Sequence, residues 1–103
     1  MGLTRAEIFS EEQNKLAAMF KLLAHPARIA ILQYIAVNKS GICNDLIDEL
    51  GLAQATVSQH LKELKTFGIL KGKIEGKSVI YSIDPDMWIT VRGNFAIFFA
   101  QEI

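Results

Sequence analysis

The sequence predicts a mainly α-helical protein that carries one small β-hairpin. Apolar residues recur at helical spacing over most of the chain, for example at Val57, Leu61 and Leu64, which occupy positions i, i+4 and i+7. From Leu70 to Ile83 the apolar period changes to two, and a polar segment with a glycine interrupts the alternation, as expected of a hairpin. We therefore expect one α+β domain over residues 1–103, with about five helices.

Two capping-box patterns mark the start of the first helix. Thr4 is followed three residues later by Glu7, and Ser10 is followed three residues later by Gln13. The first helix, expected over residues 4–24, should begin near one or both of these pairs.

A His-Pro pair at positions 25–26 separates the first helix from the second. Proline has no amide proton and restricts the residue before it, but it suits the first turn of a new helix. His25 at this junction is interpreted as a structural hydrogen-bonding group, and Arg28 as an ion-pairing or phosphate-positioning group. We expect the second helix over residues 27–37, with core positions at Ile29, Ile31, Leu32 and Ile35.

Residues 44–67 have the order helix, tight turn, helix. Asn44 is expected to cap a short helix that ends at Gly51, because glycine suits the left-handed conformation at a helix end. A second helix then begins near Gln54, which gives the helix-turn-helix plan. The hairpin of residues 68–83 follows directly and is in the position of a wing, so the expected fold is a winged helix-turn-helix. Ile42 and Cys43 are expected to pair with this wing as a short strand.

The second helix of this motif has a polar face opposite its apolar stripe. Hydroxyl and amide groups can hydrogen-bond base edges or phosphates, and lysine neutralises phosphate charge. The net charge of the chain is zero, but residues 51–83 contain five lysines and two acids, a local balance of +3. An ordinary solvated helix would have a similar composition, but the helix-turn-helix context favours DNA binding. We expect Gln54, Ala55, Thr56, Ser58, Gln59 and His60 in the major groove, Lys62 and Lys65 near the DNA backbone, and Lys73 and Lys77 on the wing.

The last helix, expected over residues 86–102, is rich in aromatic residues. A single small domain does not easily bury so much aromatic surface on a terminal helix, so we expect a partner. The alternative is that this helix folds back onto its own core.

Three segments together resemble the ArsR-type (ArsR/SmtB) winged-helix transcriptional regulators: LLAHPARIAIL at 22–32, ATVSQHLKELKTFGIL at 55–70 and GKSVIYSI at 76–83. The resemblance covers about residues 15–87. It implies a DNA-binding regulator, most often a repressor, that dimerises through its first and last helices. The two-fold symmetry of a homodimer predicts an operator of two inverted half-sites. The residues expected at the dimer interface are Leu16, Phe20, Trp88, Val91, Phe95, Phe98 and Phe99.

Many members of the family bind a metal, but the ligand positions are altered here. The start of the third helix, residues 42–46, contains one thiol, Cys43, and the last helix contains no histidine. His25 and His60 cannot supply the three or four ligands that zinc requires. We expect no metal and no cofactor, and we interpret Cys43 as a small core residue rather than a redox sensor. The family's ligand positions on the last helix are occupied here by Met87, Phe98 and Gln101.

Other classes of protein are disfavoured by what the sequence lacks. No signal-peptide pattern is present at residues 1–10, and no stretch reaches the ~20 apolar residues of a membrane helix, so we expect a cytoplasmic protein without a membrane partner. No catalytic constellation or phosphate-binding glycine loop is recognisable, which argues against an enzyme. The alternative function is a winged-helix protein-interaction module without DNA binding. A small-molecule effector near Trp88 and Phe95 stays an open hypothesis.

Overall fold

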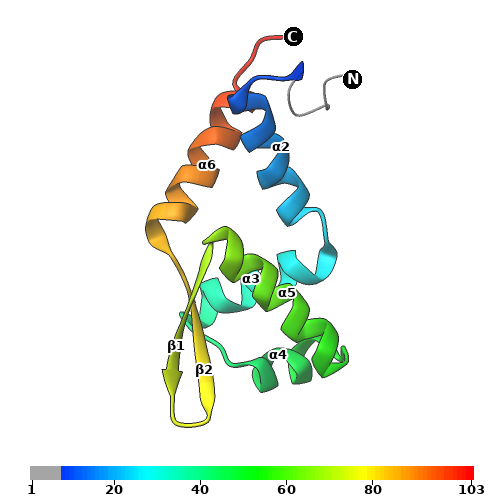
Figure 1. Cartoon of the computed structure of the whole chain (residues 1–103), viewed down its shortest axis with the longest axis vertical. Helices are drawn as coiled ribbons and strands as arrows, with labels where there is room; N and C mark the ends of the chain where they lie inside the picture. Colours follow the sequence, from blue (N-terminus) through cyan, green and yellow to red (C-terminus); the bar gives the residue numbers. More distant parts are fainter. Residues whose placement is uncertain (1–7) are drawn as a thin grey trace.

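Residues 8–103 are described by the structure, a computed structural model, and they form five helices and one two-stranded sheet (Figure 1). The predicted winged helix-turn-helix fold is confirmed, because the hairpin directly follows the second helix of the motif. In chain order the elements are α2 (Glu11–Leu23), α3 (Pro26–Asn38), α4 (Cys43–Leu50), α5 (Gln54–Phe67), β1 (Leu70–Glu75), β2 (Ser78–Ile83) and α6 (Pro85–Phe99).

The start of α2 is fixed by the second of the two predicted capping patterns. The Ser10 hydroxyl oxygen accepts the Gln13 backbone N–H at 3.1 Å, and the Gln13 side-chain oxygen accepts the Ser10 backbone N–H at 2.9 Å. This reciprocal pair satisfies two amides that have no partner within the helix. The other pattern, at Thr4, lies outside the described residues. The next helix, α3, begins at Pro26, as expected for a proline in the first turn.

The start of α4 differs from the prediction that Asn44 caps this helix. The cap residue is Ile42, whose backbone N–H donates to the Asp45 carboxylate at 3.1 Å. Isoleucine has no side-chain oxygen, so this end is stabilised by an acid in the first turn rather than by the cap side chain. At the other end, Gly51 adopts a φ of +68° and donates its N–H to the Ile47 carbonyl at 2.8 Å, as predicted.

The wing is an antiparallel hairpin with Leu70 opposite Ile83 and Glu75 opposite Ser78. The short strand predicted at Ile42 and Cys43 is wrong in position. The residue that pairs with the wing is Gly41, which forms an isolated antiparallel bridge with Tyr81. The Gly41 N–H donates to the Tyr81 carbonyl at 3.0 Å, and the Tyr81 N–H donates to the Gly41 carbonyl at 2.9 Å. These two bonds attach the base of the wing to the segment before α4.

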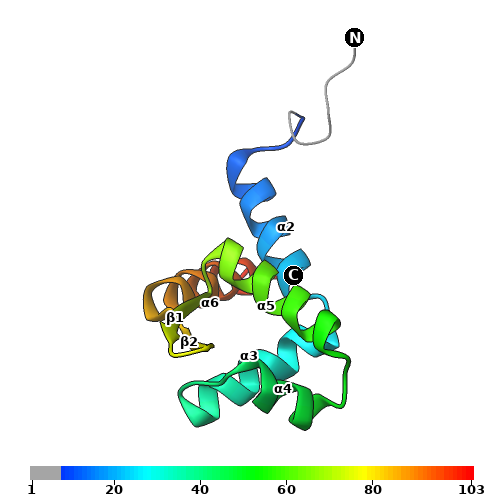
Figure 2. The ribbon, with the colours of Figure 1, turned by 60° about the horizontal axis from the view of Figure 1, so that its bottom comes forward.

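The core lies where α3, α4 and α5 pack together, with the hairpin at the side of this group (Figure 2). Val57, Leu61 and Leu64 are 0–1% exposed, so the apolar stripe predicted for α5 is buried. One core prediction is wrong: Ile29 is 41% exposed, because it lines a hollow of about 490 Å³ beside Trp88. The other core positions predicted on α3, which are buried, are Ile31, Leu32 and Ile35.

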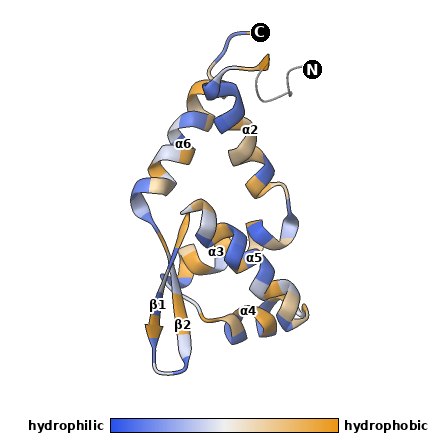
Figure 3. Cartoon of the chain, viewed as in Figure 1, coloured by the Kyte–Doolittle hydropathy of each residue, from blue (hydrophilic) through white to orange (hydrophobic). Residues whose placement is uncertain are grey.

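The terminal helices α2 and α6 extend away from the three-helix group, and the C-terminal half of α6 contacts the C-terminal half of α2 (Figures 1 and 2). The Phe20 and Phe95 rings stack with their centroids 4.3 Å apart. Hydrophobic positions continue along both helices beyond the three-helix group (Figure 3). The last helix ends at Phe99, three residues before the predicted end, and Asp84 caps its start by accepting the Met87 N–H at 3.0 Å.

Candidate nucleic-acid interface

The helix α5 presents one buried and one exposed face. Its apolar stripe docks against α3 and α4, and a helix with 3.6 residues per turn then directs its opposite residues to solvent. Seven of the eight residues predicted on α5 to contact DNA are exposed. These seven are Gln54, Ala55, Thr56, Ser58, Gln59, Lys62 and Lys65.

His60 is the exception among the residues predicted to face the groove. Its Nδ1 atom accepts a hydrogen bond from Arg28 Nε at 3.0 Å, so the ring is turned toward α3. Arg28 also donates through Nη1 to the Leu22 carbonyl at 3.2 Å, near the end of α2. The contacts of Arg28 make His60 part of a bridge that joins α2, α3 and α5, and they leave its Nδ1 atom unavailable to DNA.

The environment of His60 favours the neutral imidazole. Burial lowers the pKa of His60, and the positive charge of Arg28 and the neighbouring His25 lower it further. The His25 and His60 ring centroids are 5.7 Å apart. Because Nδ1 accepts the hydrogen bond from Arg28, the ring proton of the neutral form must be on Nε2.

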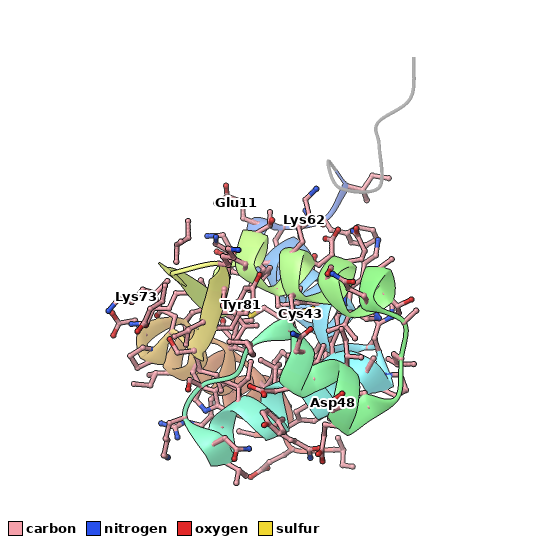
Figure 4. The ribbon with its side chains drawn as sticks, turned by 90° about the horizontal axis from the view of Figure 1, so that it is seen from below. Glu11, Cys43, Asp48, Lys62, Lys73 and Tyr81 are labelled. Atoms are coloured by element: carbon pink, nitrogen blue, oxygen red, sulfur yellow. The ribbon has the colours of Figure 1, made fainter. Side chains whose placement is uncertain are left out.

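The wing adds cationic groups beside α5. Lys73 and Lys77 are exposed, and Lys62 and Lys73 lie on the outer sides of α5 and the hairpin (Figure 4). The Lys65 ammonium extends over Gly72 of β1, 3.5 Å from the point where a Cβ atom would be. A Cβ at Gly72 would also lie 2.9 Å from Val79 Cγ1, so this glycine allows the close approach of α5 and β2 side chains.

A polar hollow of about 300 Å³ lies between the start of α4, the start of α5 and β2. Cys43 and Tyr81 both line it and appear between α5 and the hairpin in Figure 4. The Cys43 thiol lies 3.6 Å from the Ser58 hydroxyl, and the residue is half-buried against the core. Burial, and then the negative charge that Cys43 can carry, raise the pKa of Tyr81. This hollow lies between the two elements that carry the predicted DNA contacts.

Glu63, which is not among the predicted contacts, is a neighbour of the residues predicted to read DNA. The Gln59 Nε2 atom donates to Glu63 Oε1 at 2.8 Å. Spacing alone could have indicated this pair, because side chains four residues apart on a helix are neighbours.

The Arg28–His60 hydrogen bond could not have been indicated in this way. It joins residues 32 positions apart, and no local sequence pattern predicts such a contact.

The residues predicted at the dimer interface separate into covered and uncovered groups. Val91 is 5% exposed and belongs to the chain's own core, so its side chain has little surface left for a partner. Trp88, Phe98 and Phe99 are 37%, 41% and 70% exposed. Leu16, Phe20 and Phe95 are half-buried.

The described residues contain few side chains of the kinds that bind metals in close proximity. Within residues 8–103, no three His, Cys, Asp or Glu side chains lie close enough together to hold a metal ion. The two histidines lie near each other beside Arg28, whose positive charge disfavours a second cation.

A membrane-spanning helix is not found either: within residues 8–103, every helix is too short or too polar to cross a bilayer.

Comparison with known proteins places this arrangement in a family. Residues 23–72 match the helix-turn-helix domain family. An uncharacterised HTH-type transcriptional regulator of Methanocaldococcus jannaschii is 41% identical over 76 residues, which are 74% of this chain and 85% of that protein. The chain belongs to the ArsR-type family of winged helix-turn-helix transcriptional regulators.

Solved structures agree with the family membership. The crystal structure of a Mycobacterium tuberculosis protein, Rv0081, has a TM-score of 0.66 and 35% identity, and the alignment covers 88% of this chain and 96% of that one. The transcriptional repressor PagR of Bacillus anthracis has a TM-score of 0.62 and 30% identity, with coverage of 85% and 93%. This ArsR-type protein is therefore a DNA-binding transcriptional regulator and not an enzyme.

Proposed function

We propose that this ArsR-type regulator is a homodimeric, sequence-specific repressor that binds an inverted-repeat operator without a metal. One observation supports DNA reading most directly: α5 buries Val57, Leu61 and Leu64 while its opposite, polar face stays exposed next to a lysine-bearing wing. The exposed side chains of Thr56, Ser58 and Gln59 offer donors and acceptors to base edges. The proposed backbone contacts come from Lys62, Lys65, Lys73 and Lys77.

A second copy of the chain is proposed to cover the aromatic ends of α2 and α6. Phe98 and Phe99 expose 41% and 70% of their surface, and Ile97 exposes 76%. Such apolar exposure on adjoining turns is favourable only when a partner removes it from water. A two-fold axis here would relate two copies of α5 by symmetry, as an inverted-repeat operator requires.

An effector site is proposed around Trp88. This residue lines three neighbouring hollows of about 480, 490 and 270 Å³, which lie between α6 and the helices α3 and α2. Most of their lining is apolar, as is usual for small-molecule sites. Tryptophan fluorescence that stays unchanged across candidate ligands would count against this site.

The experiment that tests the repressor proposal is selection of genomic DNA with the purified protein at about 0.15 M salt. Light scattering in the same buffer measures the mass of the protein. We expect the dimer to select one inverted-repeat sequence, because two symmetric α5 helices contact two half-sites. Recovery of no sequence above background would instead favour a protein-interaction module, in agreement with the zero net charge of the chain.

A further inference from the structure

We propose that Glu63 sets the base preference of Gln59, so that Gln59 reads adenine and rejects guanine. This inference rests on the proposed role of α5 in DNA reading. The two residues are one turn apart on α5, and Gln59 Nε2 donates to Glu63 Oε1 at 2.8 Å. Gln59 is exposed and Glu63 is half-buried, so the glutamate is the better-anchored member of the pair.

The chemistry of the pair fixes which way the Gln59 amide faces. A carboxylate can only accept hydrogen bonds, so the amide must direct its nitrogen toward Glu63. Gln59 then has its carbonyl oxygen and one remaining N–H available for the DNA. This combination of one acceptor and one donor is fixed before DNA binds.

Adenine is the base that this combination matches in the major groove. It offers the N6 amino group as a donor and N7 as an acceptor, and glutamine pairs with both. Guanine offers two acceptors, O6 and N7, and would need both N–H groups of the amide. Glu63 occupies one of those N–H groups, so Gln59 cannot satisfy guanine without breaking its bond to Glu63.

The negative charge of Glu63 indicates the same role. Glu63 is the single acid among residues 54–67, on a helix whose other face residues suit phosphate or base contacts. Its repulsion of phosphate weakens binding to every sequence alike. Glu63 therefore does not increase total affinity for DNA. Its proposed contribution is to discrimination between bases, through its hydrogen bond to Gln59.

The test is a selection from randomised duplex DNA with five proteins: wild type, Gln59→Ala, Glu63→Ala, Glu63→Gln and Glu75→Ala. Alanine and glutamine are both good helix formers, so the α5 variants should fold, and circular dichroism checks this. Glu63→Gln keeps an acceptor oxygen but removes the charge. Glu75→Ala removes an exposed acid from the wing and is the matched control for charge alone.

We expect wild type to select adenine at one position in each half-site, and Gln59→Ala to lose that preference. Glu63→Ala should lower the adenine-to-guanine ratio at this position by about 2- to 10-fold, the range expected when one flexible side chain is no longer preorganised. Glu63→Gln should keep most of the ratio. All three glutamate variants should bind every sequence more tightly than wild type.

Three results would overturn the inference and leave DNA binding in place. The first is an unchanged adenine-to-guanine ratio in Glu63→Ala, and the second is a Gln59→Ala protein with the wild-type preference. The third is loss of a cytosine preference in Glu63→Ala, which would mean that Glu63 accepts directly from cytosine N4. Failure of wild type to select any sequence would instead overturn the proposed function.

Discussion

At the scale of single residues, base reading and phosphate binding have different experimental signatures. Gln59→Ala should cost about 1–3 kcal/mol on the operator and relax sequence preference, because a base contact is lost. Lys77→Ala should weaken operator and random DNA alike and reduce the slope of log affinity against log salt by about one. Fluorescence anisotropy over a salt series measures both. An equal loss on both DNAs for Gln59→Ala would exclude its base-reading role.

His60 gives a second prediction at this scale, concerning pH. Its folded-state pKa is lowered from 6.5, so an unfolded chain takes up a proton on this ring before the native chain does. The free energy of unfolding should therefore be highest above about pH 7 and should fall as the pH drops through 6.5 toward the native pKa of His60. Protonation of the native ring would also break its acceptor bond from Arg28.

Urea unfolding at about pH 7.5 and pH 5.5 measures this effect. A His60→Gln variant is the control, because glutamine can accept from Arg28 but does not titrate. The variant should lose less stability than wild type between the two pH values. An equal loss in both proteins would show that other groups cause the pH dependence.

At the scale of elements, the turn between α4 and α5 depends on the backbone of Gly51. An added methyl group would meet nothing within 4 Å, so Gly51→Ala tests the φ of +68° alone. The left-handed conformation costs an L-residue about 1–2 kcal/mol, and the free energy of unfolding should fall by about that amount.

Gly93→Ala in α6 is the matched control for Gly51→Ala. It too has open space for a methyl group, but Gly93 is not among the glycines with positive φ. Alanine should stabilise this helical position by about 0.5–1 kcal/mol. Thermal unfolding at one protein concentration should therefore give opposite signs for the two variants. A loss of the same size in both would show that the backbone conformation is not the cause.

Features that depend on neighbours in the sequence were predictable. The Ser10 capping box, the Gly51 helix end and the buried stripe of α5 each need only residues a few positions apart. Contacts between distant segments were not predictable, because no local pattern encodes them. The pairing of Gly41 with Tyr81 and the rotation of His60 toward Arg28 are of this kind.

In the candidate site too, local features were predictable from the sequence and contacts between distant segments were not. Exposure of seven α5 residues follows from helical periodicity once the apolar stripe is buried. Sequence could not show that Val91 belongs to the chain's own core while Phe99 of the same helix stays 70% exposed. That difference depends on how far α6 extends beyond the three-helix group.

At the scale of the whole molecule, a substitution of Phe99 can test dimer formation without disturbing the fold of the single chain. The side chain is 70% exposed, so Phe99→Ser should change the fold of a single chain little. If a second copy covers it, each dimer loses two buried rings, each contributing about 1.5–3 kcal/mol. The dissociation constant of the dimer should then rise by about 100-fold or more. Sedimentation equilibrium over a range of concentrations measures it.

Ile74→Ser is the matched control for Phe99→Ser. It removes an apolar side chain that is 79% exposed, but on the wing rather than on α6, so the dimer should persist. Phe99→Ser should also bind a full operator more weakly while a single half-site is bound as before, because dimerisation links the two half-sites. A Phe99→Ser protein that stays dimeric would place the two-fold contact elsewhere on the molecule. A monomer with undiminished operator affinity would show that DNA recognition does not require two linked copies of α5.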